Sequence, residues 1–170
     1  AHTAQAAGHP MRIVEVVAAV NYERKERMAD KITAACGGSV KGKTVAVLGL
    51  TFKPNTDDMR EAPSLSIIAG LKAAGASIRV FDPEGMIEAK KILRPDSIEW
   101  CEDAYDAAAG ADALTIVTEW NEFRALDLER LKEVMNGAVM VDLRNVYSPD
   151  EMSAAGFDYT CVGRASAPSD

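Results

Sequence analysis

Apolar and polar residues alternate with a helical period over the first part of the chain. Apolar residues recur every three or four positions, and charged residues occupy the other faces. Pro10 suits a first helical turn and Gly37 with Gly38 suits a helix end, so the pattern predicts one amphipathic helix of about 25 residues, about 37 Å long. Its apolar stripe could pack on a sheet of the same chain or, in a connector or dimer helix, on another domain or subunit. The apolar positions are Ile13, Val16, Val17, Val20, Met28, Ile32 and Ala35.

From Gly42 onward, short β-rich runs alternate with helical segments. Strands that alternate with helices through right-handed crossovers form a doubly wound, mostly parallel sheet. The sequence therefore predicts an α/β fold with a sheet of about six strands, preceded by the long helix. The predicted strands are 44–50, 77–81, 98–101, 113–118, 138–142 and 159–162, and the predicted helices are 64–74, 84–92, 104–109, 126–135 and 149–155.

The loop after the first predicted strand has the strongest chemical character. The strand ends at Gly49, and the loop carries Lys53 and Arg60 before a helix that begins near Pro63. Such a loop emerges at the carboxyl edge of a parallel sheet, where open α/β proteins bind ligands. Two cations beside a helix N-terminus favour a phosphate-bearing ligand. A single glycine is not the dinucleotide fingerprint, so this turn is not expected to bind NAD by itself.

Individual side chains of this loop have plain alternatives. Phe52 could offer a flat apolar face to a base or sugar, and Lys53 could reach a phosphate as a point charge. Equally, Lys53 could be a solvated lysine beside a core phenylalanine. Arg60 could be oriented by Glu61, or the two could form a simple surface ion pair. Residues 55–58 could fold the loop on itself through turns that their short polar side chains make.

Polar residues also follow the other predicted strands. Asp82 ends the second strand, where it could hold a ribose hydroxyl or only make an Asp-Pro turn. Arg144 follows the fifth strand and could close over the same ligand. Because the ends of parallel strands meet at one edge, these residues predict a binding crevice there. The other polar strand-end residues are Thr118, Glu119, Trp120, Asp142 and Asn145.

Composition limits the possible partners. The chain has 170 residues, of which 48% are hydrophobic, enough for one domain with a full core. A formal net charge of −7 argues against nucleic acid and anionic membrane surfaces as partners. No apolar run is long enough for a membrane span, and the start has no signal-peptide pattern, so we expect a cytoplasmic protein. The chain begins without Met on a polar stretch, from which we expect a fragment.

The cysteines and histidines show no spacing of a metal site or a disulfide framework, and we expect neither. Cys101 and Cys161 lie in or beside apolar strands and are expected to pack as small hydrophobes. No cysteine stands beside a base, and no acids are paired for hydrolysis, so the chain shows no catalytic centre of its own. The remaining residues of these types are Cys36, His2 and His9.

Several segments together resemble one family. TFKPNTDDMREAPS, VFDPEGM, ADALTIVTEW and VDLRNVYSPDEM occur in the order found in the UDP-glucose/GDP-mannose dehydrogenase family, and PMRIVEVVAAVNYERKERM is similar to its long central helix. The resemblance covers nearly the whole chain. It implies a connector and dimerisation helix over residues 1–38, a Rossmann-like UDP-sugar-binding domain over 39–164, and a flexible tail over 165–170.

The resemblance also implies a function for the parent protein. Such an enzyme oxidises the C6 hydroxyl of UDP-glucose to a carboxylate with NAD, giving UDP-glucuronate, and forms a homodimer through the long helix. The family's catalytic cysteine precedes that helix, so Cys36 does not correspond to it, and this fragment alone is expected to be inactive. The alternatives are a related enzyme acting on GDP-mannose or a UDP-N-acetylhexosamine, or a nucleotide-sugar-binding or dimerisation module that works alone.

The family's binding residues have counterparts at matching positions. By resemblance, Phe52 and Lys53 contact the UDP-sugar from the first loop. Arg144 and Asn145 do so from the loop after the fifth strand. Arg60 corresponds to an arginine that reaches the nicotinamide cofactor across the domain cleft. These assignments agree with the phosphate site that the charge pattern predicts.

Overall fold

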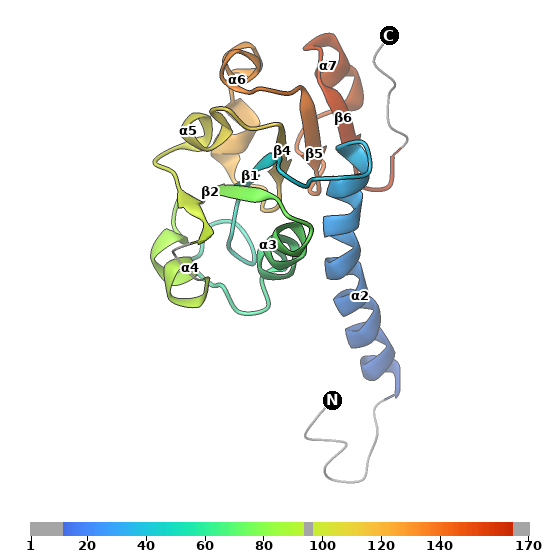
Figure 1. The fold of residues 1–170 in the computed structure, drawn as a ribbon. Coiled ribbons are helices and arrows are strands. Elements are labelled where there is room, and N and C mark those ends of the chain that lie inside the picture. Colours follow the sequence, from blue (N-terminus) through green and yellow to red (C-terminus); the bar gives the residue numbers. More distant parts are fainter. Residues whose placement is uncertain (1–11, 94–96, 165–170) are drawn as a thin grey trace.

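A six-stranded parallel sheet forms the centre of the protein (Figure 1). In the computed structural model, which describes residues 12–93 and 97–164, the strand order is β3-β2-β1-β4-β5-β6 and every neighbouring pair is parallel. The predicted doubly wound α/β fold is therefore confirmed. The order reverses between β1 and β4, the place where open α/β sheets form a ligand crevice. The strands are β1 (Thr44–Leu48), β2 (Ser77–Phe81), β3 (Glu99–Trp100), β4 (Ala113–Ile116), β5 (Val139–Asp142) and β6 (Asp158–Cys161).

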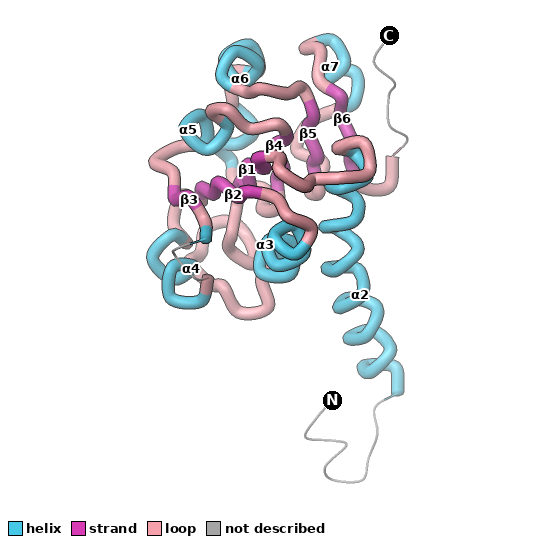
Figure 2. Tube along the Cα trace, viewed as in Figure 1, coloured by secondary structure: helices cyan, strands magenta, loops and turns pink. Residues whose placement is uncertain are grey.

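Helices cover both faces of the sheet (Figure 2). Each face has its own hydrophobic core. On one face α2, α3 and α4 pack against alternate strand residues such as Val45 and Val47. On the other face α5, α6 and α7 pack against the intervening residues, such as Ala46 and Leu48. This division follows from the period of two along a strand. The helices are α2 (Arg12–Ala35), α3 (Pro63–Ala73), α4 (Met86–Ile92), α5 (Ala104–Ala108), α6 (Leu128–Val134) and α7 (Pro149–Ala154), with a 3-10 helix η2 (Asn121–Ala125).

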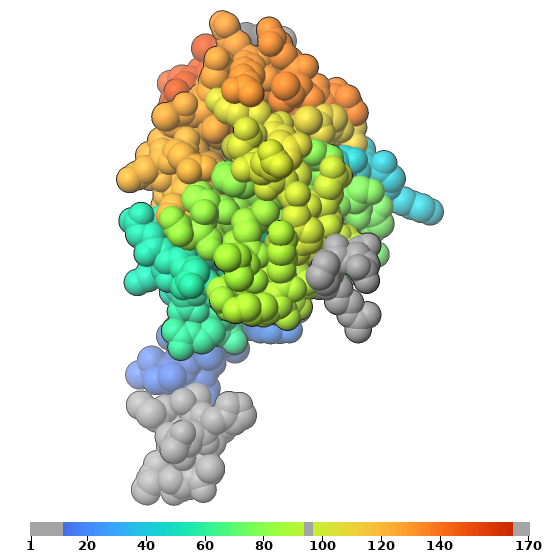
Figure 3. All heavy atoms as spheres, turned by 90° about the vertical axis from the view of Figure 1, so that its left-hand side faces the viewer, coloured from blue at the N-terminus to red at the C-terminus, as the bar shows by residue number. Residues whose placement is uncertain are grey.

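The long helix α2 has two halves with different surroundings. Its C-terminal half packs on the domain, where Ala29 and Ile32 are buried and Met28 is half-buried. Its N-terminal half extends beyond the body of the molecule (Figure 3), and Ile13 and Val16 are 82% and 62% exposed. The expectation of a helix packed on its own sheet thus holds for the C-terminal half. The N-terminal half has no cover within the described residues, and its contact with another domain or subunit stays a prediction.

Element boundaries differ slightly from the predicted ones. The first strand ends at Leu48 and not at residue 50, because Gly49 has a φ of +88° and turns the chain. A Cβ at residue 49 would lie 2.6 Å from the backbone nitrogen of Thr118, so only glycine allows β1 and β4 to approach this closely. The 3-10 helix at 121–125 was not predicted, and α6 starts later than expected, with Asp127 as its N-cap. Pro10, both histidines and residues 165–170 lie outside the described residues.

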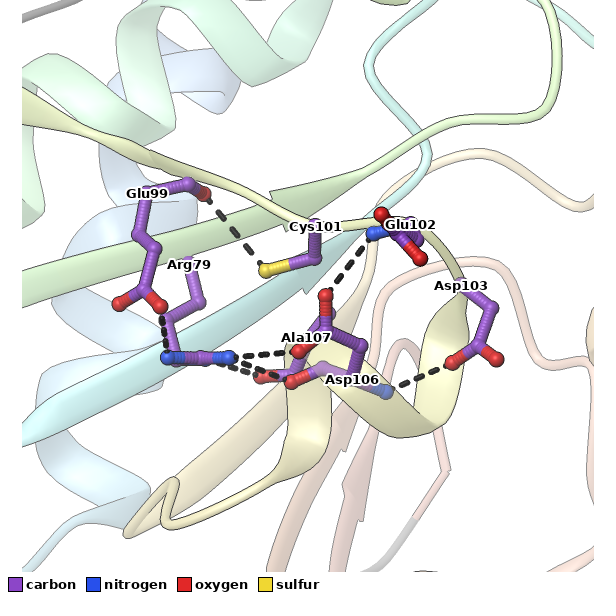
Figure 4. A network of polar contacts seen from close by, with 7 residues as sticks. All are labelled: Arg79, Glu99, Cys101, Glu102, Asp103, Asp106 and Ala107. Carbon is purple, nitrogen blue, oxygen red and sulfur yellow. Dashed lines mark hydrogen bonds and ion pairs between the residues drawn. The ribbon is translucent and has the colours of Figure 1, made fainter.

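The short edge strand β3 is fixed by a partly buried guanidinium (Figure 4). Arg79 of β2 forms ion pairs with Glu99 and Asp106, and its Nε donates to the carbonyl of Ala107 at 3.2 Å. Cys101 lies in the same network, with its thiol directed to the carbonyl of Glu99. This arrangement joins β2 to β3 and α5, because the guanidinium of one β2 residue carries enough donors for both of the other elements.

All three cysteines are buried and free, and the expectation that Cys101 and Cys161 pack as small hydrophobes is confirmed. Burial raises the pKa of the Cys101 thiol to about 11 and also raises the pKa of Cys36. Neither thiol therefore has the reactive character of a nucleophile. Among the described residues, no helix is both long and apolar enough for a membrane span.

Candidate functional site

A groove of about 820 Å³ runs between α2 and the carboxyl edge of the sheet. Phe52 and Arg144, two of the predicted binding residues, both line it, together with Val117, Leu143 and Val162 from the ends of the strands. The volume lies within the range of sites that enclose small organic ligands, about 300–1,000 Å³. The groove places the predicted residues of two separate loops on one surface. The other lining residues are Ala18, Asn21, Tyr22, Arg24, Lys25, Met28, Glu61, Pro63 and Ile67.

The wall that α2 contributes was not predicted. Asn21, Tyr22 and Lys25 face the groove, although the sequence pattern indicated only a packing or dimer helix. A signal was present, because the apolar stripe is interrupted by polar residues between Val20 and Met28. That interruption coincides with the part of α2 that borders the groove.

The loop after β1 presents Phe52 and Lys53 to solvent on a rigid base. Phe52 is 48% exposed and Lys53 is exposed, so the alternative of a core phenylalanine is wrong. The residue before them, Thr51, is fully buried. The backbone N–H of Phe52 donates to the carbonyl of Asp58 at 2.8 Å, which closes the loop on itself. The ammonium of Lys53 has no ion pair or hydrogen-bond partner among the residues that the structure describes.

Asp82 forms the base of this loop. Its side chain is 1% exposed, and its two oxygens accept hydrogen bonds from six donors of the chain itself. A carboxylate has about four lone-pair positions, so none is left for a ligand. The interpretation that Asp82 holds a ribose hydroxyl is therefore wrong. Asp82 instead has a structural role, since its carboxylate holds the surrounding backbone and side-chain donors together.

The loop after β5 is held by a second buried carboxylate. Asp142 accepts hydrogen bonds from the backbone N–H groups of Arg144 (2.9 Å) and Tyr147 (3.0 Å) and from the hydroxyl of Tyr159 (2.8 Å). Burial raises the pKa of Tyr159, so this phenol stays a donor at neutral pH. Asn145 has a φ of +55°, and its side-chain amide exchanges two hydrogen bonds with the backbone of Val162. Asp142 and Asn145 thus fix the backbone position from which the side chain of Arg144 extends.

The guanidinium of Arg144 pairs with Glu119 from the end of β4. Its Nη2 donates to one carboxylate oxygen at 2.8 Å, and its Nε donates to the other. The hydrogen bonds from Arg144 hold the pKa of Glu119 below its usual value. A bidentate pair uses two of the five N–H donors and leaves the others free in a fixed direction. Arg144 can therefore still bind a phosphate oxygen from the groove.

The expected pair of Arg60 with Glu61 is wrong. Arg60 pairs with Asp58, with distances of 2.9 Å from Nε and 2.7 Å from Nη2, and its hydrogen bonds lower the pKa of Asp58 to about 2. Glu61 instead pairs with Lys25 of α2 at 2.9 Å. The reason is the turn Met59–Ala62, in which Glu61 takes a φ of +56° and is directed away from Arg60. Asp58 and Thr56 do form the expected side-chain turns.

The described residues of the site supply groups that suit the binding of a ligand. Two cations, an exposed aromatic ring and an open groove suit a phosphorylated ligand with a flat base. All three thiols are buried, and no cluster of potential metal ligands occurs among residues 12–93 and 97–164. Lys53 and Arg60 do not line the groove, although their neighbours Phe52 and Glu61 do, and the cations of the lining itself are Arg24, Lys25 and Arg144.

Comparisons with known proteins agree with this description. Residues 46–149 match the UDP-binding domain of the UDP-glucose/GDP-mannose dehydrogenase family, and the chain belongs to that family. It is 51% identical over 162 residues to the UDP-glucose 6-dehydrogenase of Rhizobium meliloti (strain 1021), covering 95% of this chain and 37% of that protein. It is 40% identical over 161 residues to the UDP-glucose 6-dehydrogenase TuaD of Bacillus subtilis (strain 168), covering 95% and 34%.

A solved structure shows the same fold. The UDP-glucose dehydrogenase of the hyperthermophilic archaeon Pyrobaculum islandicum matches with a TM-score of 0.75 and 31% identity, over 96% of this chain and 35% of that one. The chain thus spans about a third of the length of the relatives that it matches. The match includes α2 as well as the sheet, because nearly all of this chain is covered.

Proposed function

We propose that this chain is the UDP-binding part of a UDP-glucose 6-dehydrogenase, which oxidises UDP-glucose to UDP-glucuronate with NAD. The observation that carries the proposal is the convergence of Phe52 and Arg144 on one groove, with Lys53 beside it. The relatives with 51% and 40% identity are UDP-glucose 6-dehydrogenases, which favours this substrate over other nucleotide sugars. The cytoplasmic location stays a prediction.

In this proposal the diphosphate lies between the two loops. Lys53 and Arg144 neutralise its charge from opposite sides, and Phe52 packs on the uracil or the sugar. Asn145 acts by holding the backbone that carries Arg144, through its bonds to Val162. The exposed arrangement of Lys53 costs little to reorganise, because this side chain gives up no partner among the described residues when it binds.

This domain does not present a dinucleotide site for NAD. The turn after β1 has a single glycine, and the acid at the end of β2 is saturated by the chain's own donors. NAD, which accepts hydride from the substrate, would thus be held mainly by another domain of the parent enzyme. Arg60, with its side chain 88% exposed, is the residue that would reach the cofactor from this side.

We further propose that the exposed half of α2 forms a homodimer contact. Ile13, Val16, Val17 and Val20 lie 53–82% exposed on it, and a second copy of the same helix would bury them. Val16→Asp should shift sedimentation toward monomer, because an unpaired charge in an apolar contact is costly. Arg27→Asp, on the polar surface of the helix, is the control. An unchanged dimer in Val16→Asp would contradict the proposal.

Calorimetric titration tests the ligand. We expect UDP and UDP-glucose to bind the full chain with similar affinity and GDP to bind at least about tenfold more weakly, a difference of about 1.4 kcal/mol. Tighter binding of GDP would favour the related GDP-mannose enzymes. No binding of any of the three would contradict the assignment of the groove as a nucleotide site.

A further inference from the structure

Asp82 makes more contacts than the turn in which it stands requires. Its Oδ1 accepts from the backbone N–H groups of Glu84 (3.1 Å) and Gly85 (2.6 Å), which is the usual role of an aspartate before a helix. Its Oδ2 faces the other way. It accepts from residues of two further loops, so one carboxylate joins three segments at the carboxyl edge.

The second oxygen holds the base of the loop after β1. The backbone N–H groups of Leu50 and Thr51 donate to it at 2.6 and 3.1 Å, the hydroxyl of Thr51 donates at 3.2 Å, and the indole N–H of Trp120 donates at 3.1 Å. The carbonyls of the same two residues are also fixed, by Ser64 for Leu50 and by Thr118 for Thr51 at 2.6 Å. Every backbone polar group of Leu50 and Thr51 is thus held from inside the fold.

This base determines where the exposed part of the loop begins. Phe52 follows Thr51 directly, and Lys53 comes next. The carbonyl of Lys53 lies 3.2 Å from the Thr51 hydroxyl and shares its one proton with Asp82. A buried carboxylate without its donors would be strongly unfavourable, so the donors and Asp82 hold one another in a single arrangement. Phe52 and Lys53, the two side chains of this loop that would contact the ligand, directly follow the backbone that this network holds.

We propose that Asp82 is a positioning residue for nucleotide binding, which fixes Phe52 and Lys53 in place through the backbone of Leu50 and Thr51. The inference rests on the proposed function, since it names the residue that pre-organises the same site. In this proposal Asp82 itself does not contact the ligand. Its effect on affinity comes from the order that it imposes on the loop.

Two matched pairs of variants test this role. Asp82→Asn replaces one acceptor oxygen by a donor that faces N–H groups. Asp112→Asn is its control, because the Asp112 carboxylate accepts from the N–H of Thr44 at 2.7 Å at the opposite, amino edge of the sheet. Thr51→Val removes one buried hydroxyl from the loop. Thr115→Val removes an equally buried hydroxyl, bonded to the carbonyl of Val141 at 3.0 Å inside the sheet.

Two measurements are made on each variant of the 170-residue chain. Calorimetry gives the dissociation constant for UDP, and hydrogen exchange compares the amide of Phe52 with that of Val47 in β1, which reports global opening. We expect Asp82→Asn to weaken UDP binding about tenfold and Thr51→Val about threefold, with faster exchange at Phe52 than at Val47. The Asp112 and Thr115 variants should change affinity by less than about twofold, even where they lower stability.

The outcomes separate the two proposals. Unchanged UDP affinity and unchanged Phe52 exchange in both loop variants would overturn the role of Asp82. Equal losses of affinity in loop variants and controls would also overturn it, because they would show a general effect of destabilisation. If Asp82→Asn does not fold, Thr51→Val against Thr115→Val decides the matter. Absence of UDP binding by the unaltered chain would instead contradict the proposed function, while the exchange comparison would still show whether the network orders the loop.

Discussion

The two loops that carry the predicted cations are built on the same plan but present their charges differently. After β1, Asp82 holds the backbone and Lys53 projects with no partner of its own among the described residues. After β5, Asp142 holds the backbone and Arg144 is engaged by Glu119. In both cases a buried strand-end carboxylate sets the position of the loop. The difference lies in whether the cation is free or already paired.

This difference suggests a division of work between the two cations. A free ammonium on a flexible stem attracts a phosphate from any direction, whereas a guanidinium held by a carboxylate offers its remaining donors along a fixed line. We therefore infer that Lys53 contributes mainly electrostatic attraction and Arg144 mainly orientation. Each of the following variants separates one part of this comparison.

The largest effect should come from removing the carboxylate of Asp142, which holds the loop after β5. Asp142→Ala leaves the buried hydroxyl of Tyr159 and the N–H of Tyr147 without their acceptor, and we expect it to lower the free energy of unfolding by about 3 kcal/mol. Urea unfolding measures the loss. Asp158→Ala, at an exposed position that starts β6, should stay within about 0.5 kcal/mol of the unaltered chain. Similar losses for both would show that Asp142 has no special structural role.

Next in size is the loss of the free cation. Lys53→Ala should weaken UDP binding about tenfold, or about 1.4 kcal/mol, at about 20 mM salt and clearly less at about 500 mM, because salt screens an exposed charge. Titration calorimetry at both salt concentrations gives the two losses. Lys41→Ala, exposed at the amino edge, should leave the affinity unchanged. A loss that is equal at both salt concentrations would contradict a charge-to-phosphate role for Lys53.

A smaller effect concerns the paired cation. The pKa of Glu119 is lowered in the folded protein, so its ion pair stabilises the fold above the ordinary pKa of 4.5 and is lost as pH falls through the lower folded value. Glu119→Gln should remove this acid dependence, at a cost of about 0.5 kcal/mol near neutral pH, as for other half-exposed ion pairs. Thermal unfolding of both proteins between about pH 7 and pH 3 measures how stability depends on pH. Glu129→Gln, exposed on α6, should keep the dependence of the unaltered chain.

The smallest effect is local to the first loop. Hydrogen bonds from Arg60 lower the pKa of Asp58 from 3.8 to about 2, so the pair is present above pH 3.8 and breaks as pH falls through about 2. An NMR titration of the Asp58 carboxyl should give the low midpoint, and Arg60→Ala should return it toward 3.8. A midpoint that does not move would show that Arg60 is free for other partners without breaking any pair.

The sequence predicted the sheet well because its strands are short apolar runs between turn residues. A parallel sheet of about six strands and the place of the loops after β1 and β5 follow from alternation with helices, whereas the order of the strands was not predicted. The 3-10 helix at 121–125 was missed because no periodic pattern distinguishes such a short element. The end of β1 was placed two residues late, since apolarity alone does not show that Gly49 turns the chain.

The structure brings two of the predicted binding residues together, while their role in binding stays a prediction. Phe52 and Arg144 were expected at one edge, and both line the groove. The partner of Arg60 was assigned to the wrong acid, because the left-handed backbone of a turn decides where Glu61 points. Asp82 illustrates the same limit, since whether a strand-end acid serves a ligand or the fold depends on donors more than 30 residues away in sequence.

The two halves of α2 have a mechanical consequence for the groove. The helix is anchored near Ile32, whereas its groove-lining residues, such as Asn21, stand about 16 Å further along its axis. A tilt of about 10° at the anchor would move that wall by about 3 Å, nearly a full heavy-atom contact distance. The ion pair between Lys25 and Glu61 spans the two walls and opposes such a tilt. Such a tilt would change the distance between α2 and the two loops that carry Phe52 and Arg144, and with it the width of the groove.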